Sequence, residues 1–373
     1  MLATPEGTAR YGGRQQGLPQ AHWRNLHGLT ASSIGLGTYL GADDDAGDAG
    51  YVQAVQKAIS LGCNVFDTAI NYRHQRSERA LGRALAEAFE HGKANRAEVV
   101  VCTKGGYVPF DRALPADPEA YIRETYVAPG IAKPEDLVDG VHAMSPSYLA
   151  DQLKRSLRNL QLQAVDVYYV HNPEHQLQGL ARDEVEGRLR AAFAMLEGAC
   201  DEARVGCYGV ATWSGLRAPA GSAEHLSLER LVALAREAHA EAGARGEPRF
   251  AVVQAPLNLG MPEALVAPTQ SLGGRRVPLL DAASALGVAV VASASLLQGK
   301  LARGLPGFVQ GAFGLDSDAH RALQFTRSSP GVTTALVGMG RAEHVEENLA
   351  LARTPPARGE DLRLLFEAAS RRR

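Results

Sequence analysis

Short apolar segments alternate with longer amphipathic segments along most of this 373-residue chain. The short segments are rich in Val, Ile and Tyr, as β-strands are, and the longer ones repeat their apolar residues with the 3.6-residue period of a helix. We expect eight strands, at residues 33–36, 64–67, 99–103, 165–170, 207–211, 250–254, 289–292 and 334–337. Such an alternation produces a parallel sheet with crossover helices on its surface.

The expected helices fit between these strands. One starts at Ser145-Pro146, a pair typical of an N-cap and a first helical position, and carries four leucines along one face up to Leu160. The others cover about 50–60, 77–91, 187–203, 226–242, 277–286 and 341–352. The pattern predicts an α/β fold, a (β/α)8 TIM barrel with a long insertion after the third strand and a C-terminal helix. A doubly wound open sheet stays possible, because the number of repeats does not fix closure.

The even repeat is interrupted in two places. Residues 1–24 are polar and rich in Gly, Gln and Pro, and we expect them to form a flexible segment before a single barrel domain at residues 25–373. Residues 105–144 are far longer than the roughly 2–6 residues that usually join a strand to its helix. Asp117-Pro118 could start a short helix there, and several tyrosines supply aromatic surface. The insertion forms either a wall of the site or a layer on the barrel's flank.

Composition excludes several classes of protein. The 39 Lys+Arg and 41 Asp+Glu leave a formal charge of −2, so no net positive field attracts nucleic acid or an anionic membrane. The basic run Arg371–Arg373 is expected to be a solvated tail. No apolar run approaches the ~18 residues that span a bilayer, and the four cysteines lack metal-site spacing. We expect a soluble, cytoplasmic protein that binds neither nucleic acid nor membrane, in an oligomeric state that the sequence leaves open.

Four chemically active side chains stand at or just after the ends of successive strands. Asp67 ends the second expected strand, Tyr72 follows it by five residues, Lys104 ends the third strand and His171 the fourth. In a parallel barrel these positions share one rim. A lysine ammonium beside Tyr72 favours its phenolate and lowers a pKa that is ordinarily near ~10. Asp67 would keep Lys104 charged, and His171 could orient a substrate carbonyl oxygen.

The order of these residues resembles that of the aldo-keto reductase superfamily, from about Gly28 to Ala352. The motifs that carry the resemblance are Gly35-Leu36-Gly37-Thr38, the run from Phe66 to Tyr72, Thr103-Lys104, His171, Gly209-Val210-Ala211-Thr212, Gln254 and Glu346-Glu347-Asn348. The resemblance implies a (β/α)8 barrel that binds NADPH across its C-terminal face without a Rossmann domain. It also implies that Asp67, Tyr72, Lys104 and His171 are a catalytic tetrad, with hydride transfer between the nicotinamide and an aldehyde or ketone, or the matching alcohol, and Tyr72 as general acid or base.

The cofactor site is expected along the same rim, with no metal. A Gly-rich turn from Gly338 to Arg341 precedes a helix, and such a helix N-terminus suits a phosphate group. The resemblance assigns Glu347 and Asn348 to the adenine side and Gln254 to the nicotinamide carboxamide. The full set of expected cofactor contacts is Gly37, Thr38, Thr212, Gln254, Ser293, Leu296, Gly338, Gly340, Arg341, His344, Glu347 and Asn348.

The chain departs from the family pattern at several of these positions. Thr212 follows an alanine where many members have Ser-Asn, and Ser293 replaces an aromatic residue that stacks on the nicotinamide. Gly338 and His344 replace the basic pair that many members direct at the 2′-phosphate, although Arg341 lies close enough to substitute. NADP(H) is therefore favoured, and NAD(H) stays possible. The segment Arg73–Arg76 after the active tyrosine could bring positive charge to the substrate or form a solvated loop.

Three motifs or patterns are typical of other classes of function. The run His171-Asn172-Pro173-Glu174-His175 fits the H-x-x-E-H pattern of some zinc hydrolases, but Pro173 interrupts the helix that would align its two histidines. The Gly35–Gly41 segment lacks the G-x-G-x-x-G spacing of a Rossmann phosphate loop. A non-catalytic, nucleotide-binding regulatory barrel stays possible, because an intact tetrad favours catalysis without proving it.

Overall fold

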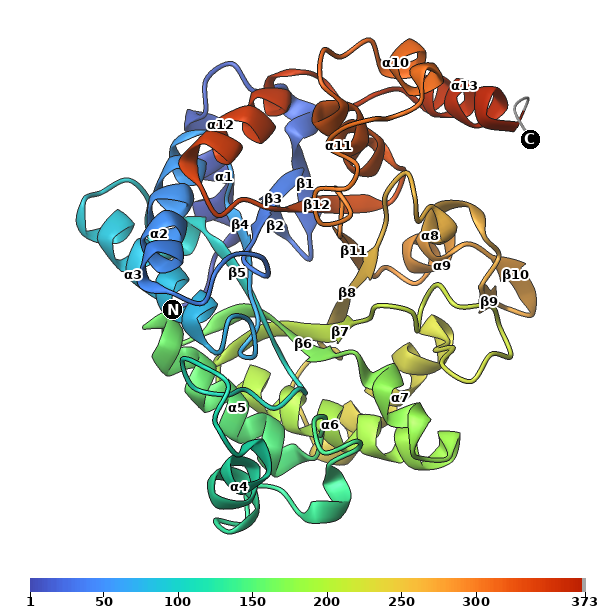
Figure 1. Ribbon diagram of the computed structural model, residues 1–373. Helices are drawn as coiled ribbons and strands as arrows, with labels where there is room; N and C mark the ends of the chain where they lie inside the picture. The colour runs from blue at the N-terminus through green and yellow to red at the C-terminus, as the bar shows by residue number, and fades with distance from the viewer. Residues whose placement is uncertain (371–373) are drawn as a thin grey trace.

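The computed structural model describes residues 1–370. Eight parallel strands close into a barrel with helices around it (Figure 1). The strands are β3 (Ile34–Gly37), β4 (Val65–Asp67), β5 (Val100–Gly105), β6 (Val165–His171), β7 (Val205–Ala211), β8 (Phe250–Pro256), β11 (Ala289–Ser293) and β12 (Val332–Gly338). β12 pairs with β3 and closes the ring. The (β/α)8 prediction is confirmed, and the open sheet is excluded.

Along each strand, successive side chains point alternately into the barrel interior and toward the surrounding helices, because the side chains of a β-strand have a period of two. Val65, Val100 and Val167 lie in the core enclosed by the strands. Neighbouring residues such as Phe66 and Val170 face the surrounding helices instead. The interior is crowded enough to need a glycine: a Cβ at position 35 would lie 2.8 Å from side-chain atoms of both Leu336 and Thr334. The barrel is therefore a packed core, and an open space can form only at its ends.

Eight helices cover the barrel: α2 (Asp45–Ser60), α3 (Arg76–Glu90), α5 (Pro146–Leu160), α6 (Arg182–Asp201), α7 (Leu228–Ala242), α9 (Leu279–Ala285), α11 (Asp318–Ser328) and α12 (Ala342–Ala350). Seven of them were predicted. The helix α11 was not, because it buries Arg321, Gln324 and Arg327 beside its apolar residues. Because polar side chains are buried on α11 together with apolar ones, its sequence shows no clear apolar stripe.

The insertion after β5 packs on the flank of the barrel and has a small core of its own. It contains α4 (Pro118–Ile122) and a π-helical turn, Arg123–Val127, and Tyr126 packs on Tyr148 of α5. Asp117 caps α4 by accepting a hydrogen bond from the Ala120 amide at 2.8 Å, as its sequence predicted. The insertion therefore mainly extends the flank, although Tyr107 at its start reaches the site described below.

The expectation of a flexible segment at residues 1–24 differs from the structure. Residues Pro5–Arg14 form helix α1, and Tyr11 is completely buried with its hydroxyl donating to the carbonyls of Ile59 (2.6 Å) and Cys63 (3.0 Å). The strands β1 (Trp23–Leu26) and β2 (Leu29–Ser32) form a hairpin whose apolar residues pack against the barrel interior. Burial of these few apolar side chains orders a segment that is polar on average.

The remaining α-helices and strands all come from the C-terminal third of the chain. They are α8 (Glu263–Val266), the hairpin of β9 (Gln270–Leu272) and β10 (Arg275–Val277), α10 (Gly307–Phe313) and α13 (Gly359–Ser370). Helix α13 is the expected C-terminal helix and lies beside α10 (Figure 1). The run Arg371–Arg373 lies outside the described residues. Within residues 1–370, no helix has both the length and the apolar character needed to cross a membrane.

The docking of α1 can be tested by truncating its buried tyrosine. We expect Tyr11→Ala to lower the free energy of unfolding by about 3–5 kcal/mol, because the change removes a buried aromatic ring and leaves two carbonyls without their donor. Urea denaturation followed by circular dichroism measures the change. Glu6→Gln, on the exposed face of the same helix, is the control and should shift stability by less than about 0.5 kcal/mol. Equal stability of Tyr11→Ala and the wild type would mean that α1 is not docked in solution.

Candidate active site

A cavity of about 1130 Å³ opens at the C-terminal ends of the barrel strands. Its wall includes the last residue of six strands: Gly37, Asp67, His171, Ala211, Ser293 and Gly338. The parallel register aligns these ends, since Gly338 pairs with Gly37 and Gly37 with Asp67. This is the end of a (β/α)8 barrel at which active sites form.

An ion pair lies at the base of this cavity. Lys104 on β5 is completely buried, and its Nζ lies 2.5 Å from Asp67 Oδ1 and 2.8 Å from the Thr68 carbonyl oxygen. The other carboxylate oxygen of Asp67 accepts a hydrogen bond from Gln254 Nε2 at 2.8 Å. Both oxygens of the carboxylate are therefore occupied, which fixes the direction of the ammonium.

Tyr72 lies directly above this ion pair. The Lys104 Nζ is 4.8 Å from the centre of the Tyr72 ring. The edges of two further rings meet it, with centres at 4.9 Å for Tyr39 and 5.8 Å for His171. The structure thus brings Asp67, Tyr72, Lys104 and His171 together, although Lys104 stands behind the wall of the cavity and the other three line it.

Burial controls the protonation of this cluster. Burial raises the pKa of Tyr72 above its ordinary value of 10.0, and the Lys104 ammonium opposes that rise without cancelling it. The expectation of a lowered pKa for Tyr72 is therefore wrong, because it rested on the ammonium alone and burial has the larger effect. Burial also raises the pKa of Asp67, against the opposing effects of Lys104 and Gln254. For Lys104, burial alone would lower the pKa, but the nearby Asp67 and Tyr72 raise it, so the amine is protonated.

His171 is a neutral imidazole at physiological pH. Burial lowers its pKa well below 6.5, and the charge of Lys104 lowers it further. Its ring lies edge-on to that of Tyr107, with centres 5.2 Å apart, and its carbonyl oxygen lies 2.7 Å from His142 Nε2. The His171 Nδ1 is buried and has no hydrogen-bond partner among the described residues. The ring can therefore offer a hydrogen bond to a ligand in the cavity.

All twelve residues expected to contact a cofactor line the same cavity. Five residues that line the cavity have a buried polar atom without a hydrogen-bond partner within the described chain: Asn71 Oδ1, His171 Nδ1, Thr212 Oγ1, Ser295 Oγ and Asn348 Oδ1. Buried polar atoms without partners are uncommon in folded proteins and are often satisfied by a ligand. Gln254 lines the cavity and also donates a hydrogen bond from its amide nitrogen to Asp67.

The far end of the cavity is formed by the turn between β12 and α12. Arg341 occupies the N-cap position of α12, and no side chain caps the free amides of the first helical turn. The Arg341 Nη2 donates to His344 Nε2 at 2.8 Å, so the two residues considered for a 2′-phosphate lie side by side. A free helix N-terminus with an adjacent guanidinium is suited to an anionic group.

Several residues near Tyr72 were not predicted as site residues. Tyr39, Tyr107, Asn172 and Trp213 all line the cavity, and Tyr39 and Trp213 expose about half of their surface (56% and 45%). All four follow a strand end by one or two residues, which is a usable signal in a barrel sequence. They add three aromatic rings and an amide group to the cavity wall.

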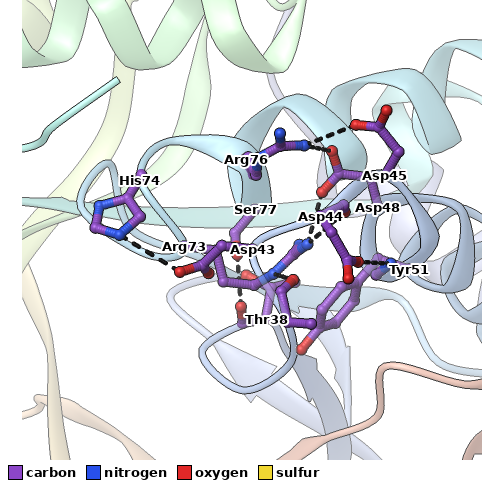
Figure 2. Close-up of polar contacts among 12 residues, drawn as sticks. Thr38, Asp43, Asp44, Asp45, Asp48, Tyr51, Arg73, His74, Arg76 and Ser77 are labelled. Atoms are coloured by element: carbon purple, nitrogen blue, oxygen red, sulfur yellow. Dashed lines mark hydrogen bonds and ion pairs between the residues drawn. The ribbon is translucent and has the colours of Figure 1, made fainter. Parts of the chain in front are cut away.

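The segment Arg73–Arg76 does not bring free positive charge to the substrate. Arg73 and Arg76 both bind Asp48, at 2.6 and 2.7 Å, and His74 Nε2 lies 3.4 Å from Asp43 Oδ2. Figure 2 shows these basic side chains directed at acidic residues in the first turns of α2 and in the loop just before it. The charges therefore neutralise one another, and neither earlier alternative describes the segment.

The zinc-hydrolase alternative is not supported by the geometry. Pro173 begins a 3₁₀-helix, so His171 on β6 and His175 are not one helical turn apart on an α-helix. The ring of Tyr107 contacts both of them, at 5.2 and 5.6 Å between centres. Glu174, the required base, accepts hydrogen bonds from the backbone amides of residues 213–215 through Oε1. Its role is therefore to hold the loop after β7.

Comparison with known proteins identifies relatives of this chain. Over 154 residues, 39% of this chain, the sequence is 29% identical to deoxymugineic acid synthase 1-D of Triticum aestivum, and the match spans only 37% of the wheat protein. Among solved structures, the glycerol dehydrogenase of Gluconobacter oxydans has a TM-score of 0.63 at 18% identity, with 95% of this chain and 96% of that chain covered.

Two further structures have the same fold. The holo form of an aldo-keto reductase from Bacillus halodurans has a TM-score of 0.61 at 18% identity, covering 92% of this chain and 95% of that one. An aldo/keto reductase from Klebsiella pneumoniae, in complex with NADP and acetate, has a TM-score of 0.60 at 21% identity, covering 92% and 93%. The model of the aldo/keto reductase family matches residues 33–304, which include seven of the eight barrel strands, from β3 to β11. This chain belongs to the aldo/keto reductase family.

Proposed function

We propose that the protein is an NADP(H)-dependent oxidoreductase that interconverts an aldehyde or ketone and the matching alcohol. The observation that carries the proposal is the tyrosine held over a buried Lys104–Asp67 ion pair at the wall of a large cavity. The family and the NADP complex of the Klebsiella pneumoniae relative support the choice of cofactor.

The residues present fit a dinucleotide. The cavity runs from the free N-terminus of α12 to Tyr72, and it is larger than the roughly 300–1,000 Å³ of most small-molecule sites. Arg341 and His344 would hold the phosphate of the adenosine end, beside the unpartnered Asn348 Oδ1. Thr212 and Ser295 offer unpartnered hydroxyls nearer to the barrel centre. When bound, the nicotinamide would supply or accept the hydride.

The chain's own residues supply the proton chemistry. In reduction, the Tyr72 hydroxyl donates its proton to the substrate oxygen as negative charge develops there. The Lys104 ammonium stabilises the phenolate that this step leaves, and Asp67 keeps the ammonium charged and in place. The neutral His171 offers a hydrogen bond that orients the substrate oxygen toward Tyr72. In oxidation, the same phenolate takes the proton of the alcohol.

Two further expectations also stay proposals. We propose a cytoplasmic location, because all four cysteines are unpaired and three of them are buried. We also propose that residues 25–373 behave as one domain, with α1 docked on it. Proteolysis of the purified protein would test the second proposal, since a stable fragment far shorter than residues 25–373 would contradict it.

The role of Tyr72 is tested by removing only its hydroxyl. We expect Tyr72→Phe to lower kcat/KM for carbonyl reduction by about 10²–10⁴-fold, because the proton donor is lost, while NADPH affinity stays within about twofold. A panel of aldehydes and ketones, followed through NADPH absorbance, measures the first quantity, and NADPH fluorescence measures the second. Tyr121→Phe, in the insertion, is the matched control and should keep wild-type activity. NADPH binding without turnover by the wild type would favour a regulatory barrel.

The role of Lys104 is tested through pH dependence. The raised pKa of Tyr72 keeps the phenol protonated through neutral pH, so alcohol oxidation, which needs the phenolate, should increase up to at least about pH 10. In Lys104→Met the opposing ammonium is gone, so the pKa rises further and the increase moves to still higher pH. We expect the oxidation rate at about pH 9 to fall more than tenfold. Lys93→Met, at the surface, is the control, and identical pH profiles for Lys104→Met and the wild type would refute the role.

Cofactor preference is tested at Arg341. We expect Arg341→Met to weaken NADPH binding by about tenfold, because one charge-assisted hydrogen bond to the 2′-phosphate is lost. NADH lacks that phosphate and serves as the matched control, so its affinity should change by less than about twofold. Fluorescence titration of the wild type and of Arg341→Met with each cofactor gives the four dissociation constants. Equal weakening for NADPH and NADH would show that Arg341 contacts a part common to the two.

A further inference from the structure

The turn that follows Tyr72 has an unusual backbone. Arg73, His74 and Gln75 adopt left-handed conformations in succession, with φ of 46°, 53° and 68°. None of them is glycine, so each conformation is unfavourable by itself and must be held by its surroundings. The turn connects Tyr72 to α3, so whatever holds it also limits the motion of Tyr72.

Arg73 supplies much of that restraint. Its side chain is only 2% exposed, and its Nη2 lies 2.6 Å from Asp48 Oδ1. Its Nε donates to the Ala42 carbonyl at 2.8 Å, and its guanidinium stacks over the Tyr51 ring at 5.1 Å. A Cβ at position 47 would lie 2.8 Å from Nη2, so the glycine found there allows the guanidinium to approach. We call Arg73, Asp48, Tyr51 and the Ala42 carbonyl the arginine clamp.

The clamp is supported by a second layer of charge. Arg76 Nη1 lies 2.7 Å from Asp48 Oδ2 and 3.0 Å from Asp45 Oδ1. Each oxygen of the Asp48 carboxylate is therefore bound by a different arginine, as Figure 2 shows. Two arginines on one carboxylate fix its orientation more firmly than an isolated surface pair would.

The clamp holds the loop that faces Tyr72. The loop, residues 38–44, leaves β3 and supplies Tyr39 and Leu40 to the cavity wall. Its first residue is fixed by Ser77, whose Oγ donates to the Thr38 carbonyl at 2.7 Å, and Leu40 is held through its carbonyl by the Tyr51 hydroxyl. Tyr39 has its ring 4.9 Å from that of Tyr72. Beyond Leu40 the loop is bound to the Tyr72 turn by Arg73, through the Ala42 carbonyl, and by His74, whose Nε2 lies 3.4 Å from Asp43 Oδ2.

We propose that Arg73 is a positioning residue, which fixes the Tyr72 turn and the 38–44 loop relative to each other and thereby orients the Tyr72 hydroxyl. The proposal rests on the proposed function, in which Tyr72 exchanges a proton with the substrate. Arg73 is suited to this task because one planar group binds a carboxylate, a backbone carbonyl and an aromatic face at once. A lysine could keep the ion pair with Asp48 but not all three contacts.

The test compares Arg73→Met and Arg73→Lys with the wild type by two independent readouts. We expect Arg73→Met to lower kcat about tenfold with a change in KM below about threefold, because a misplaced acid slows the proton step more than it weakens binding. Arg73→Lys should recover part of the loss. Arg79→Met is the matched control, because Arg79 lies on α3 but binds Asp111 and Asn159 instead of the loop.

The second readout does not require activity. Native-state cleavage by chymotrypsin after Tyr39 or Leu40, located by mass spectrometry, reports opening of the loop. We expect Arg73→Met to accelerate this cleavage at least about fivefold and Arg79→Met to leave it unchanged. The variant Tyr39→Ala should also lower kcat, and adding Arg73→Met to it should cost less than about twofold more, because both changes act through one contact.

The outcomes separate the two proposals. Unchanged cleavage, or unchanged kcat in Arg73→Met, overturns the positioning role, and so does full additivity with Tyr39→Ala. If Arg73→Met does not fold, Asp48→Asn takes its place and should show the same faster cleavage with a smaller loss of kcat. If the wild type reduces no carbonyl compound, the proposed function fails, and with it the catalytic part of the positioning role. The cleavage rates then still decide whether Arg73 holds the loop.

Discussion

The chemistry of this protein depends on one buried ion pair, Lys104 with Asp67. An ammonium moved into the interior alone would lose several kcal/mol of solvation and would release its proton instead. The carboxylate at 2.5 Å prevents that, and Gln254 and the Thr68 carbonyl satisfy the remaining directions. The pair can exist here because β4 and β5 are neighbouring parallel strands whose ends lie at one rim. The position of Tyr72 over the ammonium, and hence the proposed proton transfer, follows from this pair.

The two ends of the barrel have different tasks. The N-terminal end is closed by the β1–β2 hairpin and by α1, whose Tyr11 is completely buried, and this packing contributes stability. The C-terminal end holds the cavity, the unpartnered polar atoms and the left-handed turn after Tyr72. Such features cost stability, so they can be kept only where the rest of the fold is well packed. The insertion at residues 105–144 belongs to neither end alone. Its small core lies on the flank of the barrel, while Tyr107 at its start contacts His171 in the cavity wall.

Much of the fold and the four residues of the tetrad could be predicted, because local sequence patterns indicate both the strands and the residues at their ends. The eight barrel strands were found from short Val- and Ile-rich runs, and Asp67, Lys104 and His171 from their places at strand ends. Helix α11 was missed because its buried Arg327 and Gln324 hide the apolar stripe. The docking of α1 was missed for the opposite reason, since one buried tyrosine orders a segment that is polar elsewhere. The raised pKa of Tyr72 could not be predicted, because burial is a property of the packed chain.

The sequence by itself determined the barrel, the family pattern and which four side chains meet at its rim, because strand periodicity and strand ends are local features that a parallel barrel converts into one position in space. The tertiary structure alone decided what the charged residues around them do. Arg73 and Asp48 are separated in the chain by the rest of α2, by β4 and by the residues up to Tyr72, and nothing in the sequence pairs them. Their contact arises because β3 and β4 are adjacent in the barrel, which brings the loops after them together. Pairing between charges that are distant in the sequence depends on that packing, so local sequence patterns cannot predict it.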